Sequence, residues 1–191
     1  MRVTGGVLGG RQLRVPRSGM RPTQDRVREA FFSSIASRLP GAAFLDLFAG
    51  TGSVGIEACS RGCDSVCWVE QNRAVHGILE QNVRTLCVDG LPPGAARVIR
   101  SDSTRFLAGR DGSGVYDIVY ADPPYDIGSA WLTKALQGAG LNSILRADGV
   151  FVMETRARDA PPDETGGWNL IDRRQYGEAA LWTYARGSAR P

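Results

Sequence analysis

The segment Asp122-Pro123-Pro124-Tyr125 has the residue types best suited to chemistry in this chain. It follows the apolar run 117–121, so it is expected at the end of a β-strand. Both prolines lack an N–H donor and have a fixed φ, so they end strand pairing and stiffen the turn. Oxygen acceptors beside an aromatic ring suit a planar base that carries an exocyclic amine. A strand that simply ends in a polar, proline-rich turn is the plainer interpretation.

A second candidate site lies in the glycine-containing segment 44–58. Its apolar start predicts a short strand, which runs into Gly50, Gly52 and Gly55 and then into a helix-compatible stretch. Glycines let the backbone turn sharply and approach a ligand, and the helix N-terminus presents free N–H groups. Glu70 ends the next apolar run, where an acid can accept hydrogen bonds from ribose hydroxyls. This spacing by itself also fits a dinucleotide-binding fingerprint, which is the rival interpretation.

Acids at the ends of strand-like runs distinguish a site for a ligand with a cationic amino group from a dinucleotide-binding site. Asp46 lies inside the first expected strand, four residues before Gly50, where an NAD site would more simply carry an apolar residue. A carboxylate there can hold the cationic amino group of a methionine moiety. Asp102 follows a further apolar run and could reach an adenine amino group. Together with Glu70 and Asp122, these acids are expected at the edge where open α/β sheets bind ligands, although each alone is more often a helix cap or a solvated turn.

The chain resembles class I S-adenosylmethionine-dependent methyltransferases. More narrowly, it resembles the RsmD family, which methylates the N2 amine of a guanine in 16S ribosomal RNA. The segments that carry the narrower resemblance are 2–6, 10–13, 21–30 and 70–74, together with Asn82. The likeness runs from Arg2 to about Tyr184, and the opening segment is what favours RNA over DNA or protein as the substrate.

The resemblance implies S-adenosylmethionine as the cofactor, S-adenosylhomocysteine as its product, and no metal. It implies that Asp46 binds the methionine amino group, Glu70 the ribose hydroxyls and Asp102 the adenine N6. The other residues expected at the cofactor are Phe48, Ala49, Gly50, Thr51, Gly52, Gln71, Ser103 and Asp122.

The expected catalytic group is Asp122, Pro123, Pro124 and Tyr125. Asp122 and the Pro123 carbonyl would hold both N2–H groups of guanine, pyramidalise the nitrogen and point its lone pair at the methyl carbon. Tyr125 would stack on the base. Well-oriented reactants can gain about 7–11 kcal/mol from positioning, and stabilisation of the charge developing on nitrogen adds to that. The methylated nitrogen is acidic, so it can lose its proton after transfer.

The positive charge is concentrated at the N-terminus. Segment 1–38 contains eight arginines against Asp25 and Glu29, a balance of +6, whereas the whole chain has a net charge of +3. Lys134 is the only lysine, so a bias towards arginine explains the residue type but not its position. A basic block predicts phosphate contacts. The candidate RNA-binding residues are Arg2, Arg11, Arg21, Thr23 and Arg26, of which Thr23 and Arg26 could instead line the cofactor site.

Strand-like and helical runs alternate along the chain, which predicts an α/β protein with a mostly parallel sheet. The resemblance implies a Rossmann-like sheet of seven strands with helices on both faces and an antiparallel last strand. Segment 1–38 is expected to form a small basic hairpin and a helix, 39–186 the methyltransferase domain and 187–191 a tail. Segment 160–167 is expected to be a loop.

Composition and residue counts limit the remaining possibilities. No apolar stretch suits a signal peptide or the ~20 residues of a membrane span, so a cytoplasmic protein is expected. Cys59, Cys63, Cys67 and Cys87 lack a nearby histidine and are expected as buried thiols, and His76 is the only histidine. The expected partner is 16S ribosomal RNA within the small subunit or an assembly intermediate, bound by a monomer.

Two alternatives remain open from the sequence. The Asp-Pro-Pro-Tyr chemistry would equally serve a methyltransferase acting on DNA adenine or on a protein glutamine. The glycine segment would also serve a nicotinamide-dependent oxidoreductase or a nucleotide-binding module without catalysis.

Overall fold

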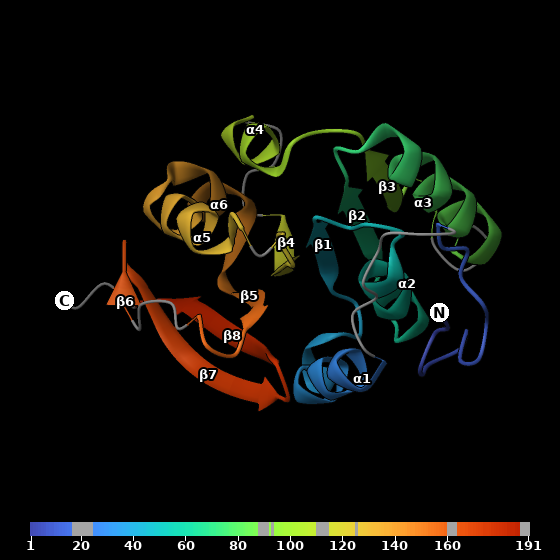
Figure 1. Cartoon of the computed structure of the whole chain (residues 1–191), viewed down its shortest axis with the longest axis horizontal. Coiled ribbons are helices and arrows are strands. Elements are labelled where there is room, and N and C mark those ends of the chain that lie inside the picture. The colour runs from blue at the N-terminus through green and yellow to red at the C-terminus, as the bar shows by residue number, and fades with distance from the viewer. Residues whose placement is uncertain are drawn as a thin grey trace. The chain divides into compact units, whose positions relative to one another are not determined.

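A computed structural model describes residues 1–16, 25–87, 92, 94–109, 115–124, 126–159 and 164–187 of the chain. The chain divides into two compact units, Met1–Asp102 and Ser103–Pro191. Both are built from strands and helices (Figure 1), which confirms the expected α/β class. Among the described helices, none combines the length and the apolar character that crossing a lipid bilayer requires.

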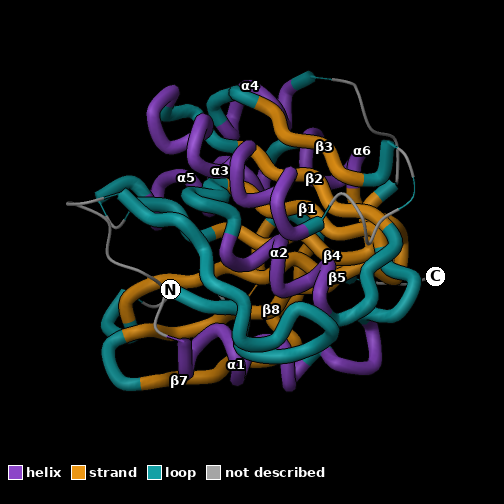
Figure 2. The backbone as a smooth tube through the Cα atoms, turned by 90° about the vertical axis from the view of Figure 1, so that its right-hand side faces the viewer, coloured by secondary structure: helices purple, strands orange, loops and turns teal. Residues whose placement is uncertain are grey.

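The first unit has a parallel sheet in the order β3-β2-β1, visible in Figure 2 with β2 between its neighbours. The helices α2 and α3 supply the crossover connections that parallel strands need, and both pack on strands of this sheet. Strands β1 and β2 are mostly buried, as their apolar residues require, whereas β3 at the end of this strand order is only partly buried. The elements are α1 (Asp25–Ser34), the 3₁₀ helix η1 (Ala36–Arg38), β1 (Ala43–Leu47), α2 (Ser53–Ser60), β2 (Ser65–Val69), α3 (Arg73–Leu86) and β3 (Ala96–Ile99).

The N-terminal segment of this unit contains the expected hairpin and helix. Arg2 and Gln12 form an antiparallel bridge, and Val3 N donates to Arg11 O at 2.9 Å. Val3 and Leu13 are buried, so the hairpin is anchored by apolar side chains as well as by its backbone. Helix α1 ends at Ser34, and the 3₁₀ helix η1 follows it. The domain boundary at residue 38 stays a prediction.

The second unit has strands in the order β4-β5-β8-β7-β6. Strands β4 and β5 are parallel, whereas β8 is antiparallel to both of its neighbours, which confirms the expected antiparallel strand. The elements are α4 (Ser103–Ala108), β4 (Tyr116–Ala121), α5 (Gly128–Gln137), α6 (Ala139–Ile144), β5 (Leu145–Arg156), β6 (Glu164–Thr165), β7 (Trp168–Tyr176) and β8 (Ala179–Arg186).

One prediction for this unit was wrong in detail. Segment 160–167 was expected to be a loop, but Glu164 and Thr165 form the short strand β6, which pairs with the start of β7. The turn at Gly166 and Gly167, both with positive φ, allows this pairing because glycine adopts left-handed backbone without a steric penalty. β6 is therefore an additional strand beyond the seven that were expected.

Candidate active site

The backbone turns sharply where β1 ends. Phe48, Gly50 and Gly52 all have positive φ, at 63°, 56° and 90°. Phe48 is not a glycine, so its left-handed backbone conformation costs of order 1–3 kcal/mol. Strained residues of this kind are typical of binding sites. Gly52 N donates to Ala49 O at 2.8 Å, and Ala49 N donates to Val69 O at 3.0 Å. The turn is therefore closed on itself and joined to β2. Residues 48–52 are called the glycine turn below.

Gly52 in this turn and Gly55 in the following helix α2 are both closely packed. A Cβ on Gly52 would lie 2.5 Å from Leu79 Cδ1, and one on Gly55 would lie 2.1 Å from Trp68 Nε1. Gly55 is thus required because α2 packs against the indole of Trp68 on β2. Trp68 is fully buried, as expected for a core residue.

Asp46 lies beneath this turn with its carboxyl almost completely buried. Its Oδ2 atom accepts a hydrogen bond from Gly55 N at 2.9 Å. Burial raises the pKa of Asp46 to about 7; the Gly55 N–H lowers it and the nearby charge of Glu70 raises it. A cation bound beside this carboxyl would favour its ionised form. The environment therefore suits an acid that becomes charged when it receives a cationic ligand.

Glu70 is joined to the same turn. Its Oε2 accepts from Gly50 N at 2.9 Å, and its Oε1 accepts from Asn72 N at 2.7 Å. The Asn72 side chain in turn caps α3 by accepting from Ala74 N and Val75 N. Each carboxylate oxygen has a second lone pair, so Glu70 can hold the turn and still accept from a ligand hydroxyl. The structure thus brings Asp46, Glu70 and the glycine turn together within the first unit.

The remaining residues expected at the cofactor have mixed exposure. Phe48 and Asp122 are half-buried, Ala49, Thr51 and Ser103 are buried, and Gln71 and Asp102 are exposed. The hydroxyls of Thr51 and Ser103 have no hydrogen-bond partner in the described part of the chain. Contact of these residues with the cofactor stays a prediction.

The Asp122-Pro123-Pro124 motif lies directly after β4, as expected for a strand end. Pro123 is buried and Pro124 is exposed. Ile127 N donates to Pro124 O at 3.1 Å, which forms a tight turn just before α5. Tyr125 lies outside the described residues, so its stacking role stays a prediction.

A buried acid near this motif was not anticipated from the sequence. Glu154 on β5 is 5% exposed, and its Oε2 accepts from the Tyr120 hydroxyl at 2.7 Å. Tyr120 is two residues before Asp122 on β4. A charged residue inside the apolar run 150–155 was the available signal, because an acid in a central strand must find a buried partner.

The chain is similar in sequence to proteins of a known family along almost its whole length. The family model described as "Conserved hypothetical protein 95" matches residues 1–185. The chain is also 35% identical over 187 residues to "Ribosomal RNA small subunit methyltransferase D" of Escherichia coli (strain K12), an alignment that covers 97% of this chain and 90% of that protein. The chain belongs to this family. The resemblance to the RsmD family is therefore confirmed.

Further proteins that are similar to this chain along most of its length support its membership of the Conserved hypothetical protein 95 family. The chain is 32% identical over 189 residues to "Putative rRNA methyltransferase YlbH" of Bacillus subtilis (strain 168), covering 97% of this chain and 99% of that one. The solved structure "Putative methyltransferase yhhF from Escherichia coli" is 33% identical, covers 98% of both chains and has a TM-score of 0.83. The methyltransferase fold expected from the sequence is thereby confirmed.

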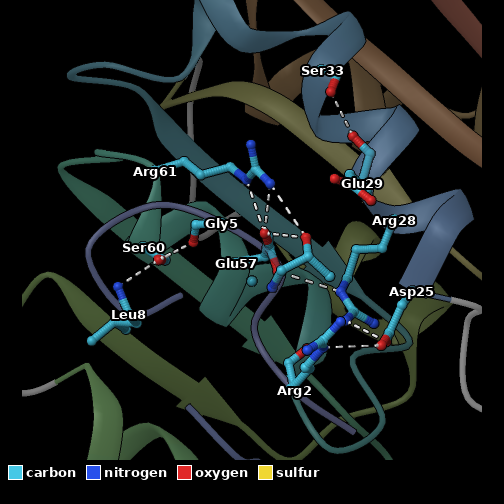
Figure 3. Close-up of polar contacts among 12 residues, drawn as sticks. Arg2, Gly5, Leu8, Asp25, Arg28, Glu29, Ser33, Glu57, Ser60 and Arg61 are labelled. Atoms are coloured by element: carbon cyan, nitrogen blue, oxygen red, sulfur yellow. Dashed lines mark hydrogen bonds and ion pairs between the residues drawn. The ribbon is translucent and has the colours of Figure 1, made fainter. Parts of the chain in front are cut away.

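The N-terminal segment of this family member is held on α2 by a buried acid, Glu57 (Figure 3). Glu57 is 0% exposed. It accepts from Thr4 N at 2.7 Å, from Thr4 Oγ1 at 2.6 Å and from Arg61 Nε at 2.9 Å. Arg28 Nε lies 3.4 Å from it. One buried carboxylate therefore connects the hairpin, α1 and α2.

Arg28 shows that part of the basic charge in segment 1–38 serves the fold. Its side chain is buried, and it donates to Arg2 O at 2.6 Å and to Asp25 Oδ1 at 2.9 Å. This arginine is thus unavailable to a phosphate. In the sequence analysis the charge of Arg28 was added to that of the other arginines, because an arginine in a helix is expected to be exposed unless its buried partner is known.

The described candidate RNA-binding residues are on the surface. Arg2, Arg11 and Arg26 are exposed, and Arg2 Nε also lies 3.8 Å from Asp25 Oδ2. Arg21 and Thr23 lie outside the described residues. Which of these residues contact RNA stays a prediction.

Within the described ranges, no group of three or more histidine, cysteine or acidic side chains could hold a metal ion. The four cysteines are free thiols, and three of them are buried.

Proposed function

We propose that this chain transfers a methyl group from S-adenosylmethionine to the N2 amine of a guanine in 16S ribosomal RNA. The observation that carries the proposal is the match along 97% of the chain to a protein named as a small-subunit ribosomal RNA methyltransferase. Both candidate motifs, the glycine turn and Asp122-Pro123-Pro124, lie inside the matched region 1–185.

The residues of the first unit fit the proposed cofactor. Asp46 has a pKa raised to about 7 by burial, so a cationic amino group would ionise it and gain a buried ion pair. Glu70 lies at the end of β2 with both oxygens anchored on backbone N–H groups and lone pairs remaining for ribose hydroxyls. The buried, unpartnered hydroxyl of Thr51 is a further polar group at the glycine turn. When bound, S-adenosylmethionine supplies a methyl group activated by the sulfonium charge.

In the proposed reaction, the residues of the second unit act on the guanine amine. Asp122 and the Pro123 carbonyl accept hydrogen bonds from the two N2–H groups. This favours a pyramidal nitrogen whose lone pair is no longer delocalised into the ring and points at the methyl carbon. After the N–C bond forms and the S–C bond breaks, the cationic nitrogen loses a proton to Asp122 or to water. Orientation of the reactants contributes most of the acceleration, about 7–11 kcal/mol in well-aligned cases. Electrostatic stabilisation of the charge developing on nitrogen by the Asp122 carboxylate adds to this.

The proposed substrate is 16S RNA in the small subunit or an assembly intermediate, and the proposed enzyme is a monomer. Support comes from the basic N-terminal segment, where Arg2, Arg11 and Arg26 are exposed. Phosphate contacts from these arginines would make binding weaken steeply with salt.

Methyl transfer from tritium-labelled cofactor tests the proposal. The assay compares naked 16S RNA, immature small subunits, DNA and protein, and mass spectrometry then identifies the modified nucleoside from cells with and without the gene. N2-methylguanosine in 16S RNA that depends on the gene is the expected result. Label in DNA adenine or in protein glutamine would favour the alternative substrate class instead.

A further inference from the structure

Asn82 joins two segments of the first unit that are far apart in sequence. It lies on α3 and its side chain is 3% exposed. Its Nδ2 donates to Thr51 O at 2.9 Å and to Arg14 O at 3.0 Å, and its Oδ1 accepts from Arg14 N at 2.9 Å. One buried carboxamide therefore contacts both the glycine turn and the basic N-terminal segment.

The two contacts hold backbone atoms, so they report on backbone conformation. Thr51 lies between Gly50 and Gly52, whose positive φ angles set the direction of its carbonyl. If the turn relaxed, that carbonyl would leave Nδ2, and a buried amide donor would lose a hydrogen bond. A buried polar group left without a partner is costly, so Asn82 favours the closed turn.

Arg14 fixes the amide from the other side. Its N–H and its C=O bind opposite ends of the Asn82 carboxamide, so the amide cannot rotate by half a turn without placing donors against donors and acceptors against acceptors. The Arg14 side chain is exposed, and its Nη1 donates to Gln81 Oε1 at 2.9 Å on the helix surface. The arginine that contacts Asn82 through its backbone thus presents its charge to the surface.

We propose that Asn82 is a positioning residue that links RNA binding to cofactor binding. This proposal rests on the proposed function. Cofactor bound at the glycine turn stabilises the conformation in which the Thr51 carbonyl accepts from Asn82 Nδ2. The Asn82 amide, fixed in this way, stabilises the backbone at Arg14 through its two other hydrogen bonds. RNA bound at that segment stabilises the turn through the same three hydrogen bonds, because linkage between two ligands is reciprocal.

The first test measures RNA binding with and without S-adenosylhomocysteine, using a 16S RNA fragment and the full chain. For the unmodified protein, saturating S-adenosylhomocysteine should tighten RNA binding about fivefold or more, and RNA should tighten S-adenosylhomocysteine by the same factor. In Asn82→Ala this factor should fall below about twofold. A linkage factor that Asn82→Ala leaves unchanged would overturn the proposal, as would the absence of linkage in the unmodified protein.

Gln81→Ala is the matched control. It removes the neighbouring contact to the Arg14 side chain on the same helix but leaves all three Asn82 hydrogen bonds in place. This variant should keep the linkage factor of the unmodified protein. If it lost the factor as completely as Asn82→Ala does, the link would run through the arginine side chain, and the role assigned to Asn82 would be wrong.

A second measurement needs no variant and remains decisive if Asn82→Ala fails to fold. Amide hydrogen exchange of the unmodified protein should slow in the peptide containing Arg14 when S-adenosylhomocysteine binds, since its N–H donates to Asn82 Oδ1. Unchanged exchange there, with slowed exchange at the glycine turn, would refute the link.

Failure of this inference is distinguishable from failure of the proposed function. A chain that methylates 16S RNA but shows no linkage would refute only the role of Asn82. A chain that binds S-adenosylhomocysteine but methylates no RNA would refute the function itself.

Discussion

At the scale of single residues, Asp46 has the most unusual environment in the candidate site. Its carboxyl is buried, with a pKa raised to about 7 from 3.8. In the unfolded chain this acid ionises near pH 4, whereas in the folded protein it keeps its proton until about pH 7. The folded state therefore binds more protons in that window, so the contribution of Asp46 to stability falls as the pH rises from about 4 to about 7.

The affinity for the cofactor should depend on this titration. In the role proposed for Asp46, the ionised carboxylate binds the cationic amino group of the cofactor, so below pH 7 a proton must leave before the ion pair forms. We expect S-adenosylhomocysteine to bind about tenfold more weakly at pH 6 than at pH 8, as measured by calorimetry. Asp46→Asn should bind more weakly at pH 8 and lose this pH dependence. An unchanged slope in Asp46→Asn would assign the titration to another group.

Asp122 should matter for turnover far more than for cofactor binding. Asp122→Ala removes the proposed acceptor for the amine, and loss of one preorganised electrostatic contact is expected to lower kcat by about 100-fold or more. The affinity for S-adenosylhomocysteine should change by less than about tenfold, or 1.4 kcal/mol. The matched control is Asp126→Ala, which removes an exposed acid a few residues along the same loop. Comparable losses in both variants would contradict a specific role for Asp122.

At the scale of elements, α2 organises the N-terminal segment. Ser60 Oγ donates to Gly5 O and accepts from Leu8 N, while Ser60 O accepts from Val7 N. A Cβ on Gly6 would lie 1.9 Å from Ser60 O, so the hairpin can approach the end of α2 only with glycine at this position. The glycine-rich segment 5–10 is therefore a docking surface for α2 as well as a turn.

Glu57 should be essential to this arrangement. Glu57→Ala removes the buried acceptor of Thr4 and Arg61 and the buried ion-pair partner of Arg28, and breaking a buried ion pair costs about 3–5 kcal/mol. Urea unfolding measures this loss. Glu29→Ala, an exposed acid on α1, should change the free energy of unfolding by no more than about 0.5 kcal/mol. A loss below about 1 kcal/mol in Glu57→Ala would mean that the network contributes little to stability.

At the scale of the whole molecule, the ligand that stabilises the folded chain distinguishes a methyltransferase from a nicotinamide-dependent oxidoreductase. A ligand that binds only the folded state stabilises it, by about 2.7 kcal/mol at a concentration 100 times its Kd. Thermal unfolding should therefore shift upwards with S-adenosylhomocysteine and stay in place with NAD at the same concentration. A shift with NAD alone would favour the oxidoreductase.

Much of this protein follows from local sequence. The proline pair after an apolar run predicted where β4 ends, since proline cannot donate to a ladder. The glycine spacing predicted the turn after β1, and the apolar alternation predicted the strands and helices that flank it. These features depend on residues close together in the chain, so their physics can be read without knowing the fold.

Tertiary structure decided how the charged and polar residues are used. Arg28 and Glu57 look like ordinary helix residues, yet they form a buried pair because the hairpin packs over them. Asp46 acquires its raised pKa, and Asn82 its three backbone partners, from segments distant in sequence. Burial and long-range pairing set the free energy of such groups, and both exist only once the chain has folded.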